Sequence, residues 1–187
     1  MRTIKAYHFL KDDMCGGYGD ESVWKVGEER KVNGKLVMCQ WGYHASPSFY
    51  DALNYAKGNM ACIVELSGEI IKDTDKYVAR KRKLIGAKDS EKVLRAWGCD
   101  CAERALKKAK VKDERSWNAI KVARLYNEGK ATPKELAAAR AAARAAAWEA
   151  AWDAAREAAW DAAWDAEIKW QKRRLNKLMK ELFESKK

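Results

Sequence analysis

Arginines on three consecutive predicted helices are the strongest candidates for binding chemistry in this chain of 187 residues. Helices joined by short connections pack antiparallel, so the guanidinium groups would converge near one pole of a bundle. Several unpaired arginines close together attract an anion, and each can give phosphate two parallel hydrogen bonds. A tryptophan one turn beyond the last arginine would then stack on an attached base. The candidate anion-binding residues are Arg104, Arg124, Arg140, Arg144 and Trp148.

The alternative role for these arginines is structural, because an arginine that pairs with Asp100 or Glu103 needs no further anion. A second basic candidate is a patch over residues 78–112, which holds twelve basic and four acidic residues. Such a patch attracts nucleic acid, nucleotides or an acidic protein, or else is a solvated surface. It opens with the run Arg80, Lys81, Arg82 and Lys83.

The five cysteines predict reduced thiols and no metal site. Their number is odd and most lie in apolar patterns, which is not typical of a disulfide framework. Cys99 and Cys101 are a close pair, but on a helix they point about 200° apart and cannot both face one metal ion. The sequence shows no nucleophile triad and no phosphate-binding loop, and we expect no cofactor.

Helices from residue 89 onward must position the arginines. The periodicity predicts a first helix over residues 89–110, a second over 115–127, and a third that starts at Thr132-Pro-Lys-Glu135. No Gly or Pro follows Pro133, so the third helix could run unbroken for about 75 Å, or fold back. Its large side chains recur every four residues, at Arg140, Arg144, Trp148, Trp152, Arg156, Trp160 and Trp164. Packing in a bundle, stacking on a planar ligand and self-association are the alternatives for this surface.

Residues 1–88 predict a separate strand-rich domain. The Asn33-Gly34 pair is typical of a tight hairpin turn, and Ser48-Phe-Tyr-Asp51 is a capping box that opens a short helix. Strand-prone runs are found at residues 4–10, 61–66 and 69–71. The predicted fold class is α+β: a small strand-rich domain over residues 1–88, then an all-α bundle over residues 89–187 with a long Ala/Trp-rich C-terminal helix.

Two parts of the chain resemble known families. Leu94-Arg-Ala-Trp-Gly-Cys-Asp-Cys-Ala-Glu-Arg104, residues 119–126 and the Ala-rich repeat resemble a helical domain family described as immunity proteins. Residues 5–10, 41–47 and 64–69 resemble an uncharacterised domain that is common in phages and prophages. These resemblances imply that the protein acts in a conflict between a phage and its host, or between a toxin and its antidote.

A third resemblance, to ADP-ribosyltransferases, rests on Tyr7-His8 and on Gly42-Tyr-His-Ala-Ser46 with a tyrosine downstream. In that family an early His-bearing strand and a later Gly-aromatic-x-x-Ser strand hold NAD. The resemblance implies that the early histidine binds the ribose, that a tyrosine stacks on nicotinamide and that a glutamate on a later strand is catalytic. The implied NAD-site residues are His8, Tyr43, His44, Tyr55 and Glu65, with Glu69 as the alternative carboxylate.

Charge and resemblance together predict a non-enzymatic, phage-type immunity or counter-defence protein that binds and sequesters an anionic partner, such as a nucleotide-derived immune signal. The net charge of +11 favours such a partner. The alternatives are an ADP-ribosyltransferase-like, NAD-using enzyme in the N-terminal domain and an antidote that binds an acidic toxin surface.

Nucleic acid is a less favoured partner, because acidic residues throughout the repeat would repel a phosphate backbone. Self-association through the C-terminal helix stays open. No apolar run is long enough to span a membrane and no signal peptide is evident, so we expect a cytoplasmic protein of a bacterial host, encoded by a phage or prophage.

Overall fold

The computed structural model describes residues 3–17, 20–153 and 161–185, and the chain forms two compact units. The strand unit consists of Met1–Glu91 with Lys172–Lys187, and the helical unit consists of Lys92–Gln171. The last helix, α5 (Asp161–Glu184), contributes to both. The fold class is α+β, as predicted. The predicted boundary after residue 88 lies close to the observed one, but residues 172–187 group with the strands and not with the helices.

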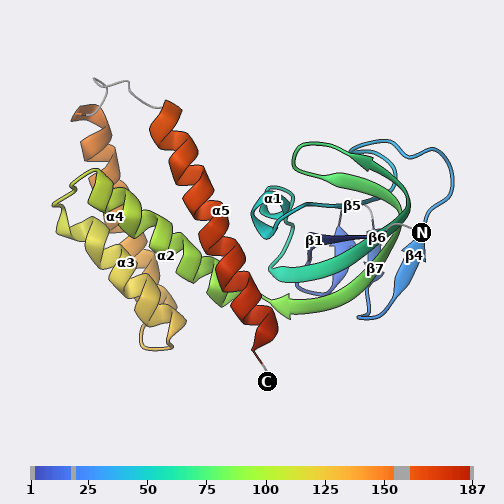
Figure 1. Ribbon diagram of the computed structural model, residues 1–187. Helices are drawn as coiled ribbons and strands as arrows, with labels where there is room; N and C mark the ends of the chain where they lie inside the picture. Colours follow the sequence, from blue (N-terminus) through green and yellow to red (C-terminus); the bar gives the residue numbers. More distant parts are fainter. Residues whose placement is uncertain (1–2, 18–19, 154–160, 186–187) are drawn as a thin grey trace. The chain divides into compact units, whose positions relative to one another are not determined.

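A long β-hairpin is the centre of the strand unit (Figure 1). Its strands are β6 (Met60–Lys72) and β7 (Tyr77–Asp89), and β1 (Ile4–Leu10) pairs antiparallel with the other edge of β6. The sequence predicts two strands on either side of Ser67-Gly68, whereas β6 runs through them. The register shifts there, and Gly68 has a φ of 78°, which glycine adopts without strain. The break in the sequence pattern is therefore a β-bulge and not a turn.

Short elements complete the strand unit. Helix α1 (Phe49–Leu53) begins at Ser48, whose hydroxyl accepts the Asp51 backbone N–H at 3.2 Å, as the capping box predicts. The predicted hairpin at Asn33-Gly34 does not form; residues 32–42 form a loop with a bridge between Val37 and Trp41. The short strands are β4 (Glu29–Lys31) and β5 (Tyr43–Ala45), which pair with β7, and β2 (Cys15–Gly17) and β3 (Asp20–Val23), which pair with each other.

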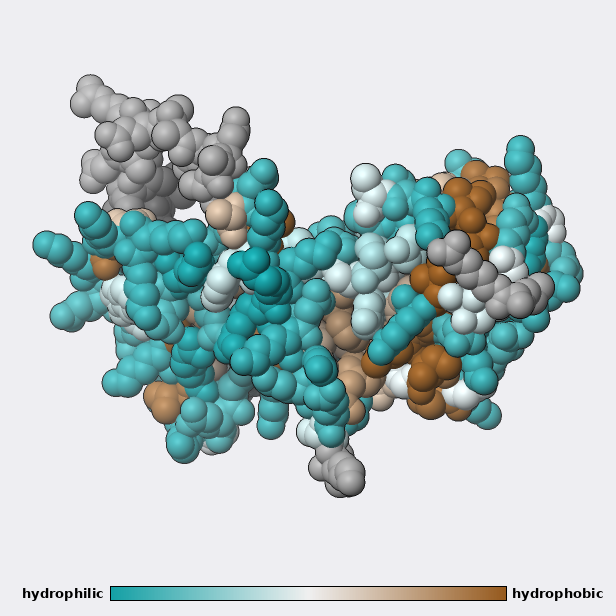
Figure 2. Space-filling model, in the orientation of Figure 1, coloured by the Kyte–Doolittle hydropathy of each residue, from teal (hydrophilic) through white to brown (hydrophobic). Residues whose placement is uncertain are grey.

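The core of the strand unit surrounds Trp24, which is buried among apolar residues of β6 and β7. Val64 of β6 and Leu84 of β7 are each 1% exposed, so the sheet residues that face Trp24 exclude water. Among the described residues, the large apolar side chains that remain exposed all belong to this unit, and Figure 2 shows hydrophobic areas on it. They are Val23, Val26, Trp41, Ile71 and Ile85.

The C-terminal half of α5 completes this core. Phe183 stacks on Phe49 of α1 with ring centroids 5.7 Å apart. Lys172 Nζ donates to both carboxylate oxygens of Asp51, at 2.9 and 2.8 Å. The fully buried side chains of α5 are Leu175 and Met179. Residues 172–187 therefore bury an apolar stripe against the strand unit, which explains why they belong to it.

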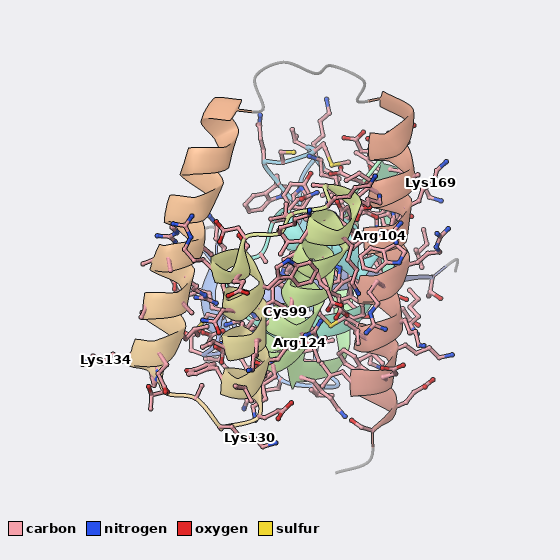
Figure 3. All side chains as sticks on the ribbon, turned by 90° about the vertical axis from the view of Figure 1, so that its left-hand side faces the viewer. Cys99, Arg104, Arg124, Lys130, Lys134 and Lys169 are labelled. Carbon is pink, nitrogen blue, oxygen red and sulfur yellow. The ribbon has the colours of Figure 1, made fainter. Side chains whose placement is uncertain are left out.

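Helices α2 (Glu91–Lys108), α3 (Glu114–Asn127) and α4 (Pro133–Asp153), with the first half of α5, form the helical unit (Figure 3). The predicted capping box opens α4: Thr132 N–H donates to Glu135 Oε2 at 2.7 Å, and Glu135 N–H donates to Thr132 Oγ1 at 3.2 Å. Its small core consists of Cys99, Ile120, Ala123 and Leu136.

The predicted third helix is described in two parts, α4 and α5, because residues 154–160 lie outside the described chain. α4 packs on α3. The first half of α5 contacts α2 through side chains: Trp97 Nε1 donates to Gln171 O at 3.1 Å. Arg156 and the side chains of the four tryptophans at positions 148, 152, 160 and 164 are likewise not described, so the role of the repeat stays a prediction. In the part of the chain that the structure covers, no helix is long and apolar enough to cross a membrane.

Candidate functional site

A pocket of about 850 Å³ opens in the strand unit. This volume lies in the range of small-molecule sites. β1, β5, β7, the 32–42 loop and the segment after α1 all contribute to its walls. Its charged, imidazole and aromatic lining residues are Arg30, Lys76, Arg82, His8, His44, Trp41, Tyr43 and Tyr55.

Two neutral histidines form one side of the pocket. Burial lowers the pKa of His8 well below its ordinary value, and the neighbouring Arg82 and His44 lower it further. His8 Nε2 is buried and has no hydrogen-bond partner in the structure. Burial also lowers the pKa of His44, against a hydrogen bond to Gly42 that raises it. His44 Nε2 accepts the Cys39 N–H at 2.9 Å, so its proton is assigned to Nδ1.

Arg82 is the most deeply buried cation of the pocket, with 5% exposure. Its guanidinium donates to His44 O at 2.9 Å and lies 4.3 Å from the ring centroid of Trp24 and 5.1 Å from that of Tyr43. Arg30 lies 4.0 Å from the Trp24 ring and pairs with a glutamate, Glu28, at 2.6 Å. Aromatic faces thus hold two guanidinium groups through cation–π contacts at the edge of the pocket.

Lys76 sits where β7 begins, with Cys39 and Tyr55 around its ammonium group. Interactions with the neighbouring Cys39 and Tyr55 side chains raise the pKa of Lys76 above its ordinary value. Lys76 Nζ lies 3.2 Å from Tyr55 Oη, and Tyr55 Oη donates to Asp75 Oδ2 at 2.6 Å. Lys76 is therefore fully charged at neutral pH, and it lines the pocket.

The described lining residues include no Asp or Glu, so the charge of the pocket wall is positive. Cations, neutral imidazoles and aromatic faces suit a planar ligand with an anionic group. A carboxylate base or nucleophile is missing from these described residues, which do not supply the pair of carboxylic groups that many hydrolytic sites use.

The arginines that the sequence places in an anion site are, in two cases, paired within the helical unit (Figure 3). Arg124 Nη2 donates to Asp100 Oδ1 at 2.9 Å and to Glu103 Oε2 at 2.8 Å. Arg104 Nε donates to Glu167 Oε2 at 2.9 Å, and its guanidinium lies 4.6 Å from the ring centroid of Trp170. Burial raises the pKa of Glu167, but hydrogen bonds from a lysine and from Arg104 lower it overall.

For Arg104 and Arg124 the structural alternative therefore describes the observed contacts, because both join neighbouring helices through carboxylates. Arg140 and Arg144 are exposed on α4. The side chain of Trp148 lies outside the described residues.

The basic run of β7 divides between ion pairs at the surface and the pocket. Arg80 pairs with Glu69 and donates to Gly34 O, and Lys81 pairs with Glu29 at 3.1 Å. Lys83 is half-buried. Of the run Arg80, Lys81, Arg82 and Lys83, Arg82 alone is among the described pocket-lining residues.

Four residues of the implied NAD site meet in the pocket, and the carboxylates do not. His8, Tyr43, His44 and Tyr55 all line it. Glu65 and Glu69 of β6 are not among the lining residues.

Sequence reasoning missed Arg30, Cys39, Trp41 and Lys76. Lys76 could have been found from the polar turn at residues 73–76, had the charged segment after it been interpreted as a strand paired with Tyr43-His44-Ala45.

The fold and the site define an α+β protein with a cationic, aromatic pocket in its strand unit. Residues 4–96 match a family described as Domain of unknown function (DUF7666). The match covers the described residues that line the pocket. Comparisons with curated proteins and with solved structures find no match. The description of the family includes no activity, so the function has to be argued from the pocket.

Proposed function

We propose that the strand unit binds a small, planar anion of the nucleotide type in this pocket and holds it without turnover. The observation that carries the proposal is a pocket of about 850 Å³ whose described walls are cationic and aromatic.

The pocket offers a separate place for each part of such a ligand. Lys76 and Arg82 would pair with a phosphate, because a charged donor gives strong hydrogen bonds to an anion. The exposed ring of Trp41 would stack on the base. His8 would give or accept one hydrogen bond to a ligand hydroxyl or ring nitrogen.

This proposal keeps the anionic partner that the sequence predicts and moves its site from the helical unit to the strand unit. Sequestration of a nucleotide-derived signal by a phage-encoded immunity or counter-defence protein remains our wider hypothesis. The charge of the pocket supports the anionic partner in this hypothesis.

Isothermal titration with a panel of mononucleotides, dinucleotides and cyclic nucleotides tests the proposal. We expect binding that weakens with added salt. Lys76→Met should lower the affinity at least tenfold, since a hydrogen bond to a charged group contributes about 1.5–3 kcal/mol. The matched control is Arg144→Ala, which removes an exposed cation of the helical unit and should leave binding unchanged. Equal loss in both variants, or no binding by the parent protein, contradicts the proposal.

An ADP-ribosyltransferase-like enzyme is the second candidate, favoured by the meeting of His8, Tyr43, His44 and Tyr55 in one pocket. That candidate requires a carboxylate to act on NAD, and neither Glu65 nor Glu69 lines the pocket. Incubation with NAD, followed by mass spectrometry for free nicotinamide, separates the two. Release of nicotinamide that is lost in His8→Ala and in Glu65→Gln would establish the enzyme in place of the binding protein.

A further inference from the structure

The Trp41 side chain lines the pocket and is fixed in place, although 52% of it is exposed. Its indole Nε1 donates to Asn33 O at 2.6 Å. Its backbone exchanges two hydrogen bonds with Val37, at 2.8 and 2.9 Å. An exposed tryptophan held at its backbone and at its indole nitrogen offers a ligand a ring whose position is already set. That position depends on where the carbonyl of Asn33 lies.

Arg80 of β7 holds the backbone on either side of Asn33. Its guanidinium donates to Gly34 O and, over a longer distance of 3.4 Å, to Val32 O. In return, Val32 N–H donates to Arg80 O at 3.0 Å. The three successive carbonyls of residues 32–34 therefore accept hydrogen bonds from two side chains, those of Arg80 and Trp41. A displacement of this segment would move the acceptor that fixes the indole.

The bulge of β6 positions Arg80 in turn. Its guanidinium pairs with Glu69, and its side chain is 21% exposed. A Cβ added at Gly68 would lie 2.9 Å from Arg80 Cβ, so the glycine of the bulge leaves room for the arginine stem. Arg80 itself is not among the described lining residues of the pocket. Any effect of Arg80 on a ligand must therefore pass through the residues that it holds.

We propose that Arg80 is a positioning residue for nucleotide binding: it fixes residues 32–34, and these fix the Trp41 ring as the surface on which the base stacks. A ring that is already fixed loses little freedom when the base binds, whereas a free ring must be immobilised at a cost in affinity. The role in binding rests on the proposed function. The fixing of Trp41 by Arg80 does not, and it can be measured without any nucleotide.

Calorimetric titration of the full-length protein with AMP, GMP, CMP and UMP, and with ribose 5-phosphate as their base-free counterpart, tests the role in binding. For the mononucleotide that binds best, Trp41→Ala should lower the affinity about tenfold and Arg80→Met about threefold. Neither variant should change the affinity for ribose 5-phosphate, which has no base to stack. Arg80→Met should cause no further loss in a chain that already carries Trp41→Ala, because Arg80 acts through Trp41.

The indole N–H of Trp41 gives a readout that needs no nucleotide. Its NMR signal in ¹⁵N-labelled protein is identified by its loss in Trp41→Ala, and its exchange with water should be at least tenfold faster in Arg80→Met. The matched control is Lys81→Met, which removes the next cation of β7 and its 3.1 Å ion pair with Glu29 and should exchange at the parent rate. Arg80→Lys keeps the charge but not the two-pronged guanidinium. It should shift the exchange in the same direction, and it replaces Arg80→Met if that variant does not fold.

Three results overturn the proposal: parent-like exchange of the Trp41 indole N–H in the Arg80 variants, an equal loss of affinity for ribose 5-phosphate and for the mononucleotide, or the same loss from Arg80→Met with and without Trp41→Ala. If none of the four mononucleotides binds the parent protein, the proposed function fails, and the role of Arg80 in binding fails with it. Faster indole exchange in Arg80→Met alone would then still establish that Arg80 fixes Trp41.

Discussion

Met179→Ala should destabilise the strand unit, although Met179 lies near the end of a helix that begins in the other unit. Its side chain is fully buried. Truncation removes a methylene, a sulfur and a methyl group, which at about 0.8 kcal/mol for each buried methylene-sized group amounts to about 2.4 kcal/mol of transfer free energy. The cavity that remains adds to this cost, so we expect a loss of about 2–5 kcal/mol in the free energy of unfolding.

Urea denaturation followed by circular dichroism measures the loss, and hydrogen exchange locates it. We expect faster exchange in β6, β7 and α1, because α1 contacts the same segment through Phe49 and Phe183. Lys180→Ala is the control, since Lys180 is exposed one position further along the helix. The reasoning is refuted if Met179→Ala leaves the exchange of β6 and β7 unchanged, or if the loss is confined to α2, α3 and α4.

For three other perturbations, the structure determines the direction of the change in stability. His8 and His44 have folded-state pKa values below the unfolded value near 6.5, so the unfolded state binds protons first as the pH falls. The stability contributed by these histidines should be full above about pH 6.5 and should fall below it by up to about 1.4 kcal/mol per pH unit for each histidine. Urea titrations at several pH values measure this dependence. Gly42→Ala should cost about 2 kcal/mol or more, because Gly42 has a φ of 126° and the added Cβ would lie 2.4 Å from Val78 Cγ2; thermal melting checks this. Thr132→Ala should cost about 1 kcal/mol by removing the capping box of α4, with faster hydrogen exchange in its first turn.

The parts of the fold that could be predicted from sequence are those with local signals. The capping boxes at Ser48 and Thr132 depend on neighbouring residues, and both helices begin where these motifs indicate. β7 was missed because a run of four cations is typical of a solvated surface. The strand forms because the backbone of β7 pairs with β6 along its length, while Arg82 turns inward and packs on Trp24.

In the candidate site, too, residues with local sequence signals could be predicted, and residues placed by long-range pairing or packing could not. His8, Tyr43, His44 and Tyr55 could be chosen because each belongs to a short motif, and all four line the pocket. Lys76 has no such motif, and finding it would have required recognising the pairing of β5 with β7, which are more than 30 residues apart. The arginines of the helical unit were chosen for their charge, and which carboxylate each one meets is decided by helix packing rather than by sequence spacing.

The location of the bound anion is the most direct test of the central claim. Hydrogen exchange should be measured on the full-length protein with and without the nucleotide that binds best in the titrations. We predict slower exchange in β1, in residues 37–46 and at the start of β7, which carry His8, Cys39, Trp41, His44 and Lys76. Slower exchange in α3 and α4 around Arg140 and Arg144, with no change in β1 and β5, would contradict it.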